Sequence, residues 1–97
     1  MLPGEGSFEE GSLADAVRFV ATERDITQRE SEVMLLLVEG KTRRAICEEL
    51  TVSPDTVKTH VRAVYRKLGV HSQQELIDRM VVEREQLVAD DSASVLE

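Results

Sequence analysis

Apolar residues recur along the chain at the three- and four-residue spacing of amphipathic helices, and no segment shows the two-residue alternation of a strand. Four segments between residues 27 and 89 carry this pattern, and each follows a Ser or Thr that can serve as an N-cap. The pattern predicts an all-α fold. The expected helices begin and end at Thr27 and Gly40, at about Arg43 and Leu50, at Pro54 and Gly69, and at Ser72 and about Ala89.

Local signals support these helix starts. Thr27 and Glu30 fit a capping box, in which each side chain accepts a hydrogen bond from the other's backbone amide, and Ser72 and Glu75 fit a second one. Ser53 precedes a proline, which is favoured at the first position of a helix because its missing N–H has no intrahelical partner there.

The two ends of the chain carry weaker signals. Residues 1–11 mix Gly, Pro, Ser and Glu, which predicts a flexible lead, and Ser12 can cap a short extra helix that reaches about Glu23. The expected division is a lead or linker over residues 1–26, a folded domain over residues 27–89 and a frayed tail over residues 90–97.

Composition indicates a single small domain. The chain has 97 residues, 41% hydrophobic and 3% aromatic, so its core has to be built from aliphatic side chains. No apolar run approaches the roughly 20 residues of a membrane span, and the acidic N-terminus does not resemble a signal peptide. Cys47 is the only cysteine, which excludes an intramolecular disulfide framework. We expect a cytoplasmic protein that contacts no membrane.

Charge is distributed unevenly. The net charge is −7, yet residues 41–67 carry seven basic and three acidic side chains, a net of +4. Residues 1–40 and 68–97 carry −6 and −5, so a basic block lies between two acidic flanks. Exposed charges are screened over about 8 Å at physiological salt, so the local charge outweighs the net charge and a polyanionic partner stays admissible.

The segment 54–68 separates its apolar residues from its basic ones. Lys58, Arg62 and Arg66 recur every four residues on one helical face, with Thr59 beside them. This face suits phosphate neutralisation and contact with base edges in a major groove, although an isolated basic stripe is more often a solvated face. A separate narrow arc predicts a buried stripe of Val57, Val61, Val64 and Leu68.

The residues before this helix change that balance. A short helix from about Arg43, a turn over residues 51–53 and a capped second helix form a helix-turn-helix pattern. Cations at a helix N-terminus oppose the helix dipole, whereas the backbone N–H groups there bind anions. A DNA phosphate would account for the basic start of this helix, and simple solubilisation is the alternative. The residues concerned are Lys41, Thr42, Arg43 and Arg44.

Several motifs at fixed spacing run through residues 26–78. They are Thr27-x-Arg29-Glu30-x-Glu32-Val33, Gly40, Ile46, Leu50, Ser53, Thr56-Val57-Lys58-x-His60, Lys67-Leu68-Gly69-Val70 and Glu75-Leu76. This segment, just over half of the chain, resembles the DNA-binding domain of LuxR/FixJ/NarL-type transcriptional regulators. The TVKxH and KLGV motifs at this spacing are far more specific than a generic helix-turn-helix.

The resemblance implies a four-helix domain whose third helix enters the major groove, where Lys58, Thr59 and Arg62 would contact base edges. Thr56 and the start of the second helix would hold the DNA backbone, and the fourth helix would form a dimer. The predicted phosphate contacts are Lys41, Thr42, Arg43, Arg44, Thr56 and Arg66. The chain departs from the family pattern at Arg43, Ala45, Cys47 and Gln73, where Asn, a polar residue, Ala and a basic residue are common.

The last helix is more apolar than one buried face requires. One stripe can close the core, and the remainder can meet a second copy, which would set two recognition helices about one DNA turn apart. The residues predicted for this dimer interface are Leu76, Met80, Val81 and Leu87. The expected partners are double-stranded DNA and a second copy on that DNA, with RNA polymerase as a further candidate.

Signals for catalysis or a metal site are weak. His60 and His71 have no Cys, Asp or Glu at metal-ligand spacing, and Cys47 lies on the apolar side of its helix, where a thiol is expected to be buried and unreactive. We therefore expect no enzyme activity, no cofactor and no metal. The chief alternative is a small acidic module that binds protein through its last helix without DNA contact. A promoter-reading sigma-factor region is a closer alternative, against which TVKxH and KLGV argue.

Overall fold

The computed structural model describes the backbone of residues 12–96 and the side chains of residues 12–87, and within that range it contains helices and no strands. This confirms the all-α prediction, with the extra N-terminal helix present. The lead predicted over residues 1–11 lies outside the described residues. The helices are α1 (Leu13–Glu23), α2 (Gln28–Val38), α3 (Arg43–Leu50), α4 (Pro54–Leu68) and α5 (Gln73–Leu96).

The caps explain where the helices begin. The box at α2 is confirmed, because Thr27 Oγ1 accepts from the Glu30 amide at 3.2 Å and Glu30 Oε1 accepts from the Thr27 amide at 3.0 Å. The box predicted at α5 is half formed. Ser72 Oγ accepts from the Glu75 amide at 3.1 Å, but the Glu75 carboxylate accepts from His71, one residue before the cap, at 2.9 Å.

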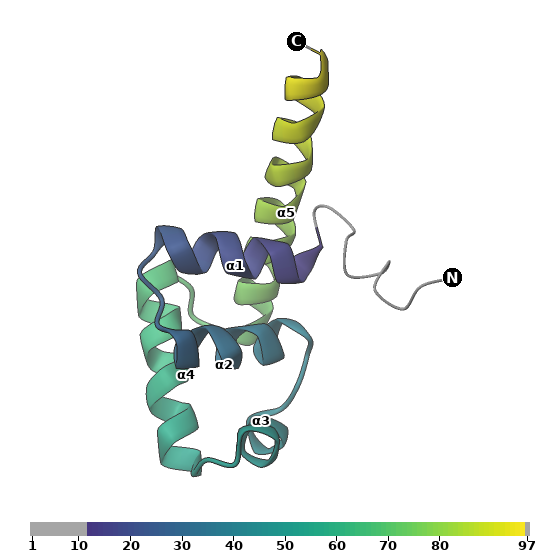
Figure 1. Ribbon diagram of the computed structural model, residues 1–97. Coiled ribbons are helices and arrows are strands. Elements are labelled where there is room, and N and C mark those ends of the chain that lie inside the picture. Colours follow the sequence, from purple (N-terminus) through teal and green to yellow (C-terminus); the bar gives the residue numbers. More distant parts are fainter. Residues whose placement is uncertain (1–11, 97) are drawn as a thin grey trace, which may run out of the picture.

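One helix boundary differs from expectation, whereas α1 has the predicted cap at Ser12 and the predicted end at Glu23. The helix α5 continues to Leu96 rather than ending near Ala89. The short helix α1, which the sequence allowed as part of a linker, packs against α2 and α5 (Figure 1) and buries Ala16, Val17 and Val20. The folded unit therefore includes α1.

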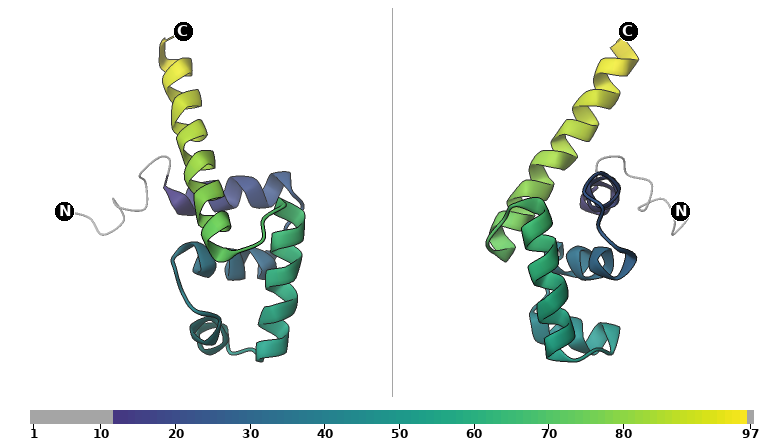
Figure 2. Two further views of the ribbon diagram at one scale, coloured as in Figure 1. Left: turned by 180° about the vertical axis from the view of Figure 1, so that it is seen from behind. Right: turned by 90° about the vertical axis from the view of Figure 1, so that its left-hand side faces the viewer.

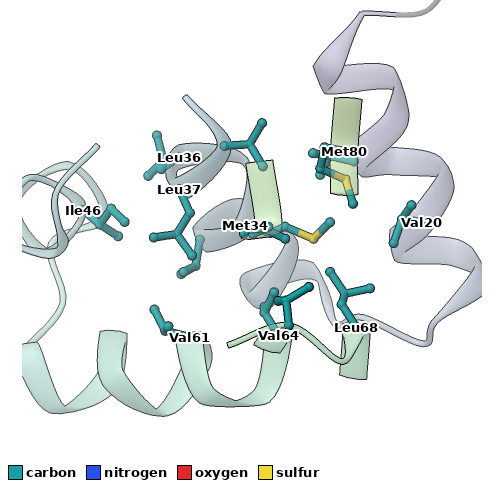
Figure 3. Packing of buried hydrophobic residues seen from close by; sticks show 14 of the residues in the cluster. Val20, Met34, Leu36, Leu37, Ile46, Val61, Val64, Leu68 and Met80 are labelled. Atoms are coloured by element: carbon teal, nitrogen blue, oxygen red, sulfur yellow. The ribbon is translucent and has the colours of Figure 1, made fainter. Parts of the chain in front are cut away.

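Buried aliphatic side chains from all five helices face one interior (Figure 3). Met34 of α2 and Ile46 of α3 are 0% exposed. Burial of this surface is the main term that holds the helices together. The stripe predicted on α4 is confirmed, since it lies entirely in this core: Val57, Val61, Val64 and Leu68.

The helices give the molecule two distinct ends. In every view, α3 and the start of α4 lie at one end, and the C-terminal half of α5 points away from them at the other (Figures 1 and 2). No helix in the described part of the chain has the length and apolar character of a membrane span.

Candidate nucleic-acid interface

The outward face of α4 carries the basic residues singled out from the sequence. Lys58, Thr59, Arg62 and Arg66 are all exposed, because the opposite face of the helix is held in the core. Among the described side chains, no carboxylate lies within ion-pair distance of Lys58, Arg62 or Arg66. These three cations are therefore available to a polyanion without first breaking an internal pair.

The turn before α4 sets the direction of that face. Thr51 ends α3 in the left-handed region at φ 56°, and Ser53 caps α4 by accepting from the Thr56 amide at 3.2 Å. Thr51 is β-branched, so this conformation carries local strain, which the tight turn requires. The Thr56 hydroxyl is half-buried and lies 3.0 Å from Ser53 Oγ, at the rim of the basic face.

The start of α3 forms the second part of the surface. Thr42 is the N-cap and accepts from the Ala45 amide at 3.1 Å, while Lys41, Arg43 and Arg44 are exposed around it. The first amides of a helix have no intrahelical partner, so this end presents both N–H groups and cationic side chains. Arg44 reaches Glu48 only at 3.7 Å, and its side chain is 90% exposed.

A cleft of about 400 Å³ between α3 and α4 joins the two parts. Arg43 and Arg44 line it from α3, and Lys58 lines it from α4. The fold thus brings together residues predicted for phosphate contact and a residue predicted for base contact. Cys47 was expected to be buried; it is half-buried, contacting the core on one side and the cleft on the other.

Comparison with known proteins identifies the family to which this helix-turn-helix arrangement belongs. The family model described as bacterial regulatory proteins, luxR family, matches residues 24–80. The chain belongs to the luxR family. As a helix-turn-helix domain of that family, it is a DNA-binding domain that functions in the regulation of transcription.

The curated relatives that the chain matches are longer than it is. It is 43% identical over 54 residues to the HTH-type transcriptional regulator MalT of Yersinia pestis, covering 56% of this chain and 6% of MalT. It is 42% identical over 57 residues to the uncharacterized response regulatory protein YgeK of Escherichia coli, covering 59% of this chain and 39% of YgeK. No solved structure matches the chain. The chain thus spans well under two thirds of these relatives.

Two predicted dimer residues of this luxR-family domain are core residues instead. Leu76 and Met80 are 0% exposed, because α1 and α2 cover the face of α5 on which they lie. A second chain could not reach them without opening the core. Val81 is half-buried, and Leu87 is half-buried against the core cluster.

Lys67 belongs to the basic block in sequence but not to the basic surface. Its Nζ donates to Glu30 Oε1 at 2.7 Å and to the Asp25 carbonyl at 3.0 Å, tying the end of α4 to the start of α2. Burial of Glu30 favours its neutral form, but hydrogen bonds from Lys67 and the Thr27 amide outweigh burial and lower the pKa of Glu30.

The sequence marked Gln73 only as a departure from the family pattern, and no contact was predicted for it. Its side chain reaches the turn before α3. No local pattern distinguishes it from Gln74, and only the approach of α5 to α2 reveals its contact.

In the described residues, no cluster of three metal-ligating side chains occurs.

Proposed function

We propose that the chain binds double-stranded DNA in a sequence-specific manner as all or part of a transcriptional regulator, with α4 in the major groove. Lys58, Thr59 and Arg62 contact base edges in this proposal. The observation that carries it is the exposed basic face of α4, whose three cations have no ion-pair partner among the described side chains, beside the exposed start of α3. The start of α4 lies beside α3 at one end of the molecule (Figure 2).

Phosphate contacts hold the domain on the duplex. A phosphate at the start of α3 would accept from its first amides and offset the cations that oppose the helix dipole there. The proposed phosphate contacts are Lys41, Thr42, Arg43, Arg44, Thr56 and Arg66, all of them exposed or half-buried.

The domain works by binding, without catalysis or a cofactor, in the bacterial cytoplasm. A second copy on the same DNA would meet it through the part of α5 that the core leaves accessible, which includes Val81 and Leu87. RNA polymerase is the further partner that we propose for a regulator of transcription.

Binding-site selection from a random duplex library tests the base contacts. We expect Arg62→Ala to relax preference at one base-pair position by about 1–3 kcal/mol. Arg44→Ala should weaken binding to all sequences and flatten the log–log salt dependence by about 0.9, because one phosphate contact is lost. Arg18→Ala is the matched control, since its side chain is 75% exposed on α1, away from the basic face.

Two outcomes would contradict the proposal. An unchanged selected motif with Arg62→Ala would remove Arg62 from base contact. Failure of the wild-type chain to shift any random duplex at low salt and micromolar protein would favour the alternative, a protein-binding module that acts through α5.

A further inference from the structure

The side chain of Gln73 spans from α5 to the backbone that leads into α3. Its Nε2 donates to the Leu37 carbonyl at 2.8 Å and to the Lys41 carbonyl at 3.0 Å. Both hydrogens of one amide are thus used on two carbonyls, at the end of α2 and in the turn that follows. Gln73 is the first residue of α5, so this contact joins α5 to α2 and to the turn that leads into α3.

The same turn is also fixed from the side of α2. Gly40, at φ 89°, lets the chain reverse, and the Lys41 amide donates to the Leu36 carbonyl at 3.1 Å. The backbone of Lys41 is therefore held at its N–H by α2 and at its carbonyl by Gln73. Thr42, the N-cap of α3, comes directly after it.

We propose that Gln73 is a positioning residue for DNA binding, which orients Lys41 and the first turn of α3 toward the phosphate backbone. The inference rests on the proposed function. It acts through peptide geometry, because a held Lys41 carbonyl limits the rotation that would swing Thr42 and Arg43 away from the duplex. It also links the phosphate-binding edge to α5, the helix proposed to meet a second copy.

The adjacent glutamine provides a matched control. Gln74 is exposed, and its Nε2 donates to Asp78 one turn along the same helix at 3.0 Å. Gln73→Ala and Gln74→Ala in the full chain therefore remove the same atoms one residue apart. We expect Gln73→Ala to weaken duplex binding about five- to tenfold, while Gln74→Ala stays within about twofold of wild type.

A double-mutant cycle separates positioning from general damage to the fold. In a background carrying Lys41→Ala and Arg43→Ala, whose phosphate contacts are already lost, Gln73→Ala should cost little further affinity. An equal loss of affinity in both backgrounds would assign Gln73 a merely structural role and overturn the proposal.

Hydrogen exchange of the DNA-free protein provides a readout that does not depend on DNA binding. The amides of Lys41 and Ala45 should exchange faster in Gln73→Ala than in Gln74→Ala. Unchanged exchange together with unchanged affinity overturns the proposal, with the proposed function intact. If these amides exchange faster in Gln73→Ala but the wild-type chain binds no duplex, the proposed function has failed, and the DNA role of Gln73 fails with it.

Discussion

The ion pair between Glu30 and Lys67 joins the start of α2 to the end of α4. The Glu30 and Lys67 side chains are 11% and 24% exposed, so water screens their interaction only partly. Glu30 also completes the capping box of α2, which means that one carboxylate stabilises both a helix start and an interhelical contact. Lys67 therefore belongs to the basic block in sequence but serves the fold, and it is not part of the basic face of α4.

Replacing Glu30 with Gln should lower the free energy of unfolding by about 1–3 kcal/mol at neutral pH, because Lys67 loses its charged partner. Since folding lowers the pKa of Glu30 below 4.5, the wild-type advantage is complete above pH 4.5 and is lost as pH falls through the folded-state pKa. Urea unfolding at several pH values measures this. Glu32→Gln, whose partner Arg29 is half exposed, is the control, and a gap between wild type and Glu30→Gln that does not shrink in acid would contradict the assignment.

At the scale of the element, local signals predicted helix starts better than helix partners. Caps act within four residues, so Thr27, Thr42 and Ser53 could be identified from the sequence alone. No glycine or proline follows Ala89 to stop α5, and its end was therefore misplaced. The packing of α1 determines which face of α5 is covered. The sequence of α5 alone does not predict this packing.

The contribution of α1 can be measured directly. Val17→Ala removes two buried methyl groups and should lower the free energy of unfolding by about 2 kcal/mol, the transfer term plus a cavity. Arg18→Ala, on the solvent side of the same helix, should change it by less than about 0.5 kcal/mol. Equal, small effects of both variants on thermal unfolding would mean that α1 is a linker after all.

At the scale of the whole molecule, the separation of its two ends explains how a chain with a net negative charge is compatible with binding to a polyanion. In the proposed function, the cations of α3 and α4 meet the duplex, while the C-terminal half of α5 extends away from α3 and the start of α4 (Figure 1). The exposed basic face could be predicted from local charge and helical spacing, and the base and phosphate contacts assigned to its residues stay predictions. The set of candidate dimer residues could be reduced only from the structure, which shows that Leu76 and Met80 are buried in the core.

The same separation predicts that dimer and DNA contacts can be broken independently. Val81→Glu should leave the affinity for a single half-site unchanged, because the substituted side chain lies away from α3 and α4, but should reduce cooperative occupancy of a two-half-site duplex about tenfold. Gln86→Glu adds the same charge at an exposed position on the far side of α5 and should preserve cooperativity. Sedimentation of the protein on one-site and two-site duplexes measures both quantities. If Val81→Glu retained full cooperativity, the second copy would have to pair through another surface, and the accessible part of α5 would lose its proposed role.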